Sequence, residues 1–159
     1  MPPTMTPQEF VEKWRPIALK ESAAAKEHFI DLCRVLGHDT PAEGDPQGTH
    51  YTFEAGASKT TGGQGYADVW KRGYFAWEYK GPHADLDRAY AQLLNYREAL
   101  ENPPLLIVSD MAQIRIHTNF TNTVKRVETL SLDDLLDPDR LAILRAAFTA
   151  PSRLRSTKT

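Results

Sequence analysis

Residues 67–80 read ADVWKRGYFAWEYK, and this stretch decides both the fold and the candidate chemistry. Side chains alternate on either side of a central Arg-Gly, which predicts two antiparallel strands joined by a tight turn. The first strand carries one acid, Asp68, and the second carries Glu-x-Lys. A two-residue loop at Arg72-Gly73 would leave Asp68 and Glu78 on different faces of the sheet.

A three-residue loop gives the opposite result. If Lys71–Gly73 forms the loop, Asp68 lies opposite Ala76, and Asp68, Glu78 and Lys80 share one face. Three-residue hairpin loops usually end in a left-handed residue, and glycine occupies that position here. The local turn chemistry therefore favours the arrangement in which the three charged side chains meet.

Two carboxylates and an amine on one face predict a divalent-metal centre that cuts a phosphodiester. Carboxylate and carbonyl oxygens select hard cations such as Mg²⁺ or Mn²⁺. Asp68 and Glu78 are the expected carboxylate ligands, and the backbone carbonyl of Tyr79 is a further candidate. Lys80 would lie beside the attacking water and balance the charge that develops on the phosphate. We expect Asp68, Glu78 and Lys80 to be catalytic.

The bulk composition is that of one ordinary globular domain. The chain has 159 residues, 41% of them hydrophobic and 25% charged, with a formal net charge of −2. That charge gives no global indication of nucleic-acid binding, so contact with DNA would need a local basic patch. The single cysteine, Cys33, excludes an internal disulfide and fits an apolar helical stripe. No apolar run reaches membrane length, and the N-terminal residues lack the basic-then-apolar pattern of a signal peptide. We therefore expect a cytoplasmic protein.

Helix and strand signals alternate along the rest of the sequence. Helices are predicted over residues 6–14, 19–36, 84–100 and 137–148, and further strands over 49–54, 105–109, 113–118 and 124–130. The apolar run at 105–109 predicts a central strand that is covered on both faces. Residues 37–48 are expected to be a polar loop. We place the domain at 1–148 and interpret 149–159 as a basic tail or linker.

Four other residues are candidates for the site. Glu21 shares a helical line with the apolar Ala25, so it is either a helix-start acid or a further metal ligand. Gln92 and Tyr96 lie four apart at the border of an apolar stripe, where they could hold the substrate. Lys59 lies in a glycine-rich loop that lacks the spacing of a nucleotide-binding loop. We keep Lys59 as a candidate substrate contact at the mouth of a cleft.

The order helix, strand, hairpin, helix, strand resembles the restriction-endonuclease-like PD-(D/E)xK fold, an α/β class with a mixed β-sheet flanked by helices. Asp68, with nine residues between it and Glu78-Tyr79-Lys80, is similar to the motif of that family, although Ala67 replaces its proline. Gln92-x-x-x-Tyr96 resembles the motif of RecB-type members. Glu21 falls where those members carry a helical acid.

A closer resemblance covers nearly the whole chain. The sequence resembles the N-terminal endonuclease domain of MmeI-like (type IIL) restriction–modification proteins at Lys20-Glu21, Phe29–Cys33, Ala67–Gly73, Trp77–Gly81 and His117–Phe120. The resemblance implies Mg²⁺-dependent cleavage of double-stranded DNA. It also implies fusion to a helical spacer, an adenine methyltransferase and a target-recognition domain, so sequence specificity is expected to lie outside these residues.

Three hypotheses follow from the sequence. The first is a metal-dependent DNA endonuclease domain of a bacterial restriction–modification enzyme. The second is a non-catalytic DNA-binding or docking module with the same fold. The third is a hydrolase of another phosphodiester, such as RNA. Histidine catalysis is not expected, because the five histidines are scattered and none has the spacing of metal ligands.

Overall fold

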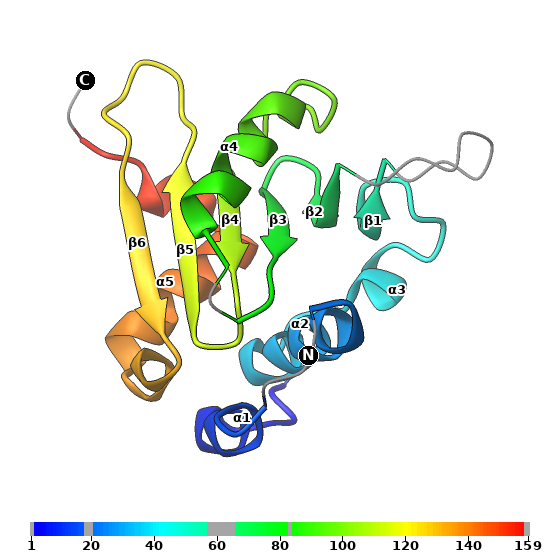
Figure 1. Cartoon of the computed structure of the whole chain (residues 1–159), viewed down its shortest axis with the longest axis vertical. Coiled ribbons are helices and arrows are strands. Elements are labelled where there is room, and N and C mark those ends of the chain that lie inside the picture. The colour runs from blue at the N-terminus through cyan, green and yellow to red at the C-terminus, as the bar shows by residue number, and fades with distance from the viewer. Residues whose placement is uncertain (1, 18–20, 57–65, 83, 158–159) are drawn as a thin grey trace.

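The computed structural model describes residues 2–157, except for residues 18–20, 57–65 and 83, and without the side chains of 21–23. One six-stranded sheet runs through the molecule with helices on both of its faces (Figure 1). Its strands are β1 (Tyr51–Ala55), β2 (Ala67–Lys71), β3 (Phe75–Tyr79), β4 (Leu105–Ser109), β5 (Gln113–Thr118) and β6 (Val127–Ser131). The predicted class, a mixed β-sheet flanked by helices as in restriction endonucleases, is confirmed.

The order of the strands in the sheet is the order in the chain. Only β3 and β4 pair in parallel, with Phe75 beside Leu105 and Tyr79 beside Ser109, whereas the other neighbouring pairs are antiparallel. A parallel pair needs a crossover connection, and helix α4 (Leu86–Tyr96) supplies it. Every residue of β4 is buried, as the continuous apolar run predicts for a central strand.

The other helices lie mainly at the two ends of the chain. They are α1 (Pro7–Trp14), α2 (Glu21–Leu36), the short α3 (Pro41–Gly44), α5 (Pro138–Thr149) and the 3₁₀ turns η1 (Asp133–Leu136) and η2 (Pro151–Leu154). Thr6 and Glu9 form the expected capping box at the start of α1. The polar loop predicted over 37–48 is wrong in part, because Thr40 and Glu43 form a second capping box that starts α3.

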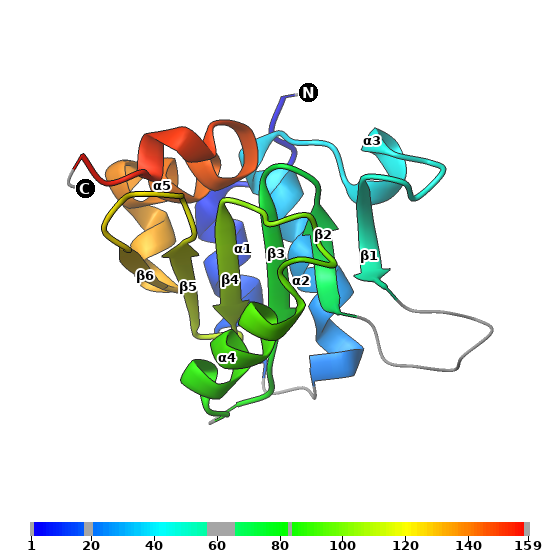
Figure 2. The same cartoon turned by 90° about the horizontal axis from the view of Figure 1, so that it is seen from above.

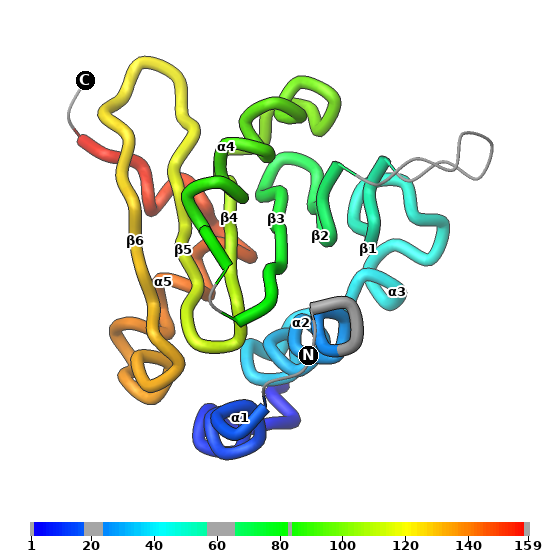
Figure 3. Tube along the Cα trace, viewed as in Figure 1, coloured from blue at the N-terminus to red at the C-terminus, as the bar shows by residue number. Residues whose placement is uncertain are grey.

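The two faces of the sheet are covered by different helices. Figure 2 shows α4 on one side of the strands and α1, α2 and α5 on the other. The trace in Figure 3 shows α4 between β3 and β4 in the chain, lying over one face of the sheet. Along β3 the side chains alternate accordingly. Trp77 belongs to the core under α2, whereas Ala76 belongs to the core under α4.

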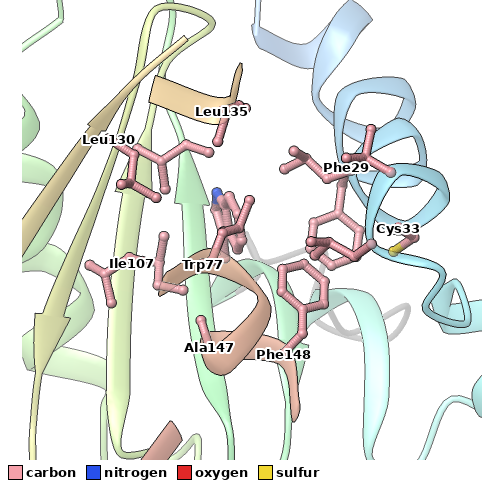
Figure 4. Packing of buried hydrophobic residues seen from close by; sticks show 14 of the residues in the cluster. Phe29, Cys33, Trp77, Ile107, Leu130, Leu135, Ala147 and Phe148 are labelled. Carbon is pink, nitrogen blue, oxygen red and sulfur yellow. The ribbon is translucent and has the colours of Figure 1, made fainter. Parts of the chain in front are cut away.

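The larger core joins the N-terminal and C-terminal helices across the central strands. Phe29 of α2 stacks on Phe148 of α5 with ring centroids 5.5 Å apart, and Trp77 packs its edge against both (Figure 4). Cys33 is buried in this core, as predicted, and burial raises the pKa of its thiol to about 11. The sheet that carries the site therefore rests on a continuous aromatic layer.

Several predicted boundaries differ from the structure for local reasons. The helix predicted over 84–100 ends at Tyr96, and the chain then turns so that Leu100 O accepts a 2.9 Å bond from Trp70 Nε1. The strand predicted from residue 124 begins at Val127, since Asn122 adopts a left-handed turn conformation just before it. The earlier end of α4 places a turn next to Leu100, which contacts Trp70 of β2.

Residues after 148 continue to pack on the domain. Leu154 in η2 is buried in the larger core, and its carbonyl accepts a 3.2 Å bond from Arg126. The boundary drawn at residue 148 stays a prediction. Among the described residues, no helix is both long enough and apolar enough to span a membrane.

Candidate metal centre

The β2–β3 hairpin has a three-residue loop, but the predicted register is wrong by two residues. The loop is Arg72–Tyr74 and not Lys71–Gly73, because Lys71 pairs with Phe75 inside the ladder. The amide of Tyr74 donates a 2.9 Å bond to Lys71 O, and Gly73 at the centre has φ +81°. Glycine therefore supplies the left-handed residue as expected, one position earlier in the loop.

A tertiary contact explains why Lys71 belongs to the strand. Its ammonium donates a 2.6 Å bond to Phe148 O at the end of α5 and lies 3.8 Å from the ring centroid of Tyr74. Burial lowers the pKa of Lys71 to about 8. These contacts hold Lys71 in β2, and local turn rules contain no information about them.

The observed register changes the expected partner of Asp68. Trp70 pairs with Ala76, so Asp68 is not opposite Ala76 as predicted. Continuing the ladder beyond its last pair, Val69 with Trp77, brings Asp68 opposite Glu78. A shift of two residues preserves the parity of the pleat, so a continued ladder would keep Asp68 and Glu78 on one face.

The carboxylate of Asp68 closes the open end of the hairpin. Beyond Val69 and Trp77 the strand ladder stops, and Asp68 Oδ2 accepts a 2.7 Å bond from the backbone amide of Tyr79. Asp68 is half-buried, as is Glu78. One carboxylate oxygen thus fixes the strand between Glu78 and Lys80, and the group retains a second oxygen with lone pairs for another partner.

Lys80 follows β3 by one residue and continues its alternation. Its amide donates a 2.8 Å bond to Ser109 O at the end of β4, which extends the parallel pairing past Tyr79. Residues 78 and 80 are two apart, so their side chains leave the strand on the same side. The half-buried Lys80 is therefore presented on the same side of β3 as Glu78.

The opposite face of β3 is fixed by buried polar bonds. Tyr79 Oη lies 2.8 Å from Nδ1 of His28 on α2, and Trp77 Nε1 donates a 2.8 Å bond to Ser109 Oγ. Burial lowers the pKa of His28 to about 3, so the imidazole is neutral. Sequence reasoning missed His28 and Ser109 as parts of this region. The available signal was a histidine directly before the buried Phe29 of an apolar helix.

The remaining candidates have mixed outcomes. Glu21 begins α2, but its side chain lies outside the described part, and so does the whole of Lys59. Gln92 and Tyr96 are exposed on α4. Tyr96 stacks on Tyr66, which precedes Asp68 by two residues, with ring centroids 4.9 Å apart. Tyr66 was not predicted, and its aromatic neighbour places Tyr96 beside the strand that carries Asp68.

The donor set suits a hard cation as far as it is described. Within the described side chains, no group of three or more His, Cys, Asp or Glu could hold a metal ion. Asp68 and Glu78 provide two carboxylates on adjacent strands, and the third expected acid, Glu21, is not among those side chains. Oxygen-only donors of this kind match Mg²⁺ or Mn²⁺ rather than a softer metal.

Comparison with known proteins identifies the family of the chain. The family model described as "MmeI, N-terminal domain" matches residues 5–156. No curated protein and no solved structure matches the chain significantly. The matched segment includes every helix and strand of the fold, from α1 to η2.

Proposed function

The chain belongs to the MmeI N-terminal domain family, and from this premise we propose that it is the metal-dependent endonuclease domain of a restriction–modification protein. Its substrate is double-stranded DNA, and its partners are the methyltransferase and target-recognition domains of a longer chain. The observation that carries the proposal is the hairpin geometry. Asp68 accepts a 2.7 Å bond from the amide of Tyr79, the residue between Glu78 and Lys80, and the register of the hairpin, when continued, brings Asp68 opposite Glu78.

Each residue of the site has a distinct role in this proposal. Asp68 and Glu78 hold Mg²⁺ or Mn²⁺, and Glu21 and the carbonyl of Tyr79 complete the oxygen donors. The ion, when bound, polarises the phosphate and makes water a better nucleophile at neutral pH. Lys80 provides a compact positive charge that stabilises the negative charge developing on the phosphate.

The substrate contacts come from α4 and from Lys59, which precedes β2 in the sequence. Tyr96, stacked on Tyr66, presents an exposed aromatic surface next to the strand of Asp68. Gln92 lies one helical turn from Tyr96 and can donate to a phosphate or sugar oxygen. Lys59 would add a salt-dependent contact to the backbone.

A plasmid-cleavage assay tests the proposal. The chain is incubated with supercoiled DNA in Mg²⁺, in Mn²⁺ and in EDTA, alone and joined to its methyltransferase and target-recognition domains. We expect metal-dependent nicking or linearisation, lost in Glu78→Gln and retained in Glu12→Gln, which changes an exposed acid of α1. Parallel reactions with single-stranded DNA and RNA test the third hypothesis. Cleavage that persists in Glu78→Gln would reject the assigned site.

One observation favours a second candidate, a non-catalytic DNA-binding or docking module. The bond from Tyr79 N to Asp68 Oδ2 is also what a purely structural hairpin cap would make. This candidate expects duplex binding that is unchanged in Glu78→Gln and Lys80→Ala, without metal-dependent cleavage by either form of the protein. Gel-shift and cleavage assays on the same variants separate the two candidates.

A further inference from the structure

A buried polar pair lies directly beneath the candidate metal centre. His28 Nδ1 and Tyr79 Oη are 2.8 Å apart, and the two residues are 1% and 0% exposed. The rings of Phe10 and Trp14 meet the imidazole edge-on at centroid distances of 5.1 and 5.0 Å. Aromatic contacts from α1 and a hydrogen bond from β3 therefore fix both the position and the orientation of His28.

The apolar surroundings of this pair indicate that its hydrogen bond does more than fill space in the core. Polar groups in an apolar core cost free energy unless they are paired, and two apolar residues of similar shape would fill the same space. The bond between His28 and Tyr79 instead makes a directional link between α2 and β3. Such links specify one alignment of two elements more sharply than apolar contacts do.

The alignment is set at the point where the hairpin needs it. The β2–β3 ladder ends at the pair of Val69 and Trp77, so Tyr79 has no ladder partner in β2. Besides its parallel pairing with Ser109 of β4, Tyr79 is held by two contacts, its amide by Asp68 at 2.7 Å and its hydroxyl by His28. Its neighbours on either side are the acid and the lysine of the candidate site.

We propose that His28 is a positioning residue for the metal centre: through Tyr79 it holds the end of β3 so that Glu78 and Lys80 stay aligned with Asp68. The inference rests on the proposed function. Without this bond, the Tyr79 side chain loses its anchor on α2 and the end of β3 shifts. The Asp68 carboxylate then moves with the Tyr79 amide, from which it accepts a hydrogen bond. Displacements of about 1 Å in such sites reduce activity by about a hundredfold.

The test compares two tyrosines of the same core. Tyr79→Phe removes the hydroxyl that contacts His28, and the matched control Tyr51→Phe removes a hydroxyl that donates a 2.8 Å bond to Asp39 O. Tyr51 is 2% exposed and also packs under α2. Two further variants change the imidazole: His28→Leu deletes the polar group, and His28→Asn retains one at the position of Nδ1.

The readout is binding of Tb³⁺, a hard cation that prefers oxygen ligands and luminesces when Trp77 transfers energy to it. We expect Tyr79→Phe and His28→Leu to weaken Tb³⁺ binding by about tenfold or more, since an altered carboxylate geometry lowers metal affinity. Tyr51→Phe should stay within about twofold of the wild type, although urea unfolding should show comparable destabilisation of both tyrosine variants. His28→Asn should restore most of the affinity.

Two outcomes separate this inference from the proposed function. If Asp68→Ala binds Tb³⁺ as tightly as the wild type, the metal centre itself is wrong and the inference falls with it. If Tb³⁺ binding depends on Asp68 but Tyr79→Phe matches Tyr51→Phe, the metal centre stands and the positioning role of His28 is overturned. Should His28→Leu fail to fold, the tyrosine pair still decides the question.

Discussion

The backbone amide of Tyr79 donates a 2.7 Å hydrogen bond to the carboxylate of Asp68, across a hairpin whose ladder has already ended. Asp68 thus has a structural role, which this hydrogen bond shows, and a chemical role, which we propose. An amide side chain can accept the same bond but is a poor ligand for a hard cation. The two roles can therefore be separated by substitution.

Asp68→Asn should preserve the hairpin and abolish the chemistry. We expect its free energy of unfolding to stay within about 0.5 kcal/mol of the wild type, whereas Asp68→Ala loses about 1–2 kcal/mol by leaving the Tyr79 amide without its acceptor. Both variants should lose at least about a hundredfold in metal-dependent cleavage. Urea denaturation and a plasmid assay measure the two quantities. Cleavage by Asp68→Asn at the wild-type rate would contradict the proposed role.

Lys80 should affect the rate rather than the binding of metal. Lys80→Ala is expected to lower the cleavage rate by about a hundredfold, because a charge aimed at the transition state is lost. Tb³⁺ affinity should not fall, since a cation next to the site is removed and no ligand is. Lys26→Ala is the control, because Lys26 is an exposed lysine of α2 that pairs with Glu54 at 3.7 Å. A Lys80→Ala protein with normal turnover would exclude Lys80 from the chemistry.

The sequence alone predicted a three-residue hairpin loop with a left-handed Gly73 but not its register. Parity along a strand is a local property, so any loop that preserves it would bring Asp68 and Glu78 to one side. The register depends on Lys71, whose place in β2 is stabilised by the carbonyl of Phe148, 77 residues away. No turn rule contains a contact of that range, and the predicted pairing of Asp68 with Ala76 failed for this reason.

The strongly patterned elements were the most predictable. The run at 105–109 and the alternation at 113–118 were placed with correct bounds because hydrophobic spacing determines them. The partners of the site were not predictable in the same way. His28 meets Tyr79 from a helix 51 residues earlier in the chain, and only the packing of α2 on the sheet brings them together.

Stability should fall in acid because His117 is buried in its neutral form. Burial, with smaller effects of Arg115 and Lys125, lowers its pKa to about 4 from an ordinary value of 6.5, and Asp87 opposes this. A base with a lowered folded-state pKa contributes full stability above 6.5, and that contribution is lost as pH falls through 4. The loss should be on the order of 1–3 kcal/mol.

His117→Phe isolates this contribution. Phenylalanine can keep the stacking on Tyr90, whose ring centroid is 3.8 Å from that of His117, but it cannot be protonated. Urea midpoints at pH 7.5 and 4.5 should therefore differ less in His117→Phe than in the wild type. The remaining difference has the same sign, because burial also lowers the pKa of His28. Equal differences in the two proteins would contradict the assignment.

Gly73 should couple the hairpin turn to the metal centre. Its φ of +81° lies in the left-handed region, and an added Cβ would meet nothing within 4 Å, so the cost of Gly73→Ala is conformational and not steric. We expect a loss of about 1 kcal/mol in the free energy of unfolding. Gly73→Asn should lose less, because asparagine tolerates this conformation better than alanine.

Gly81→Ala provides the matched control at the other end of β3. An added Cβ at Gly81 also meets nothing within 4 Å, and its φ lies outside the positive range. Gly81→Ala should therefore leave stability within about 0.5 kcal/mol of the wild type. Because the turn joins the strands that carry Asp68 and Glu78, strain at Gly73 should disturb their alignment, so Gly73→Ala should also weaken Tb³⁺ binding and Gly73→Asn should weaken it less. If Gly73→Ala and Gly81→Ala lose the same free energy of unfolding and bind Tb³⁺ with equal affinity, the turn does not control the geometry of the site.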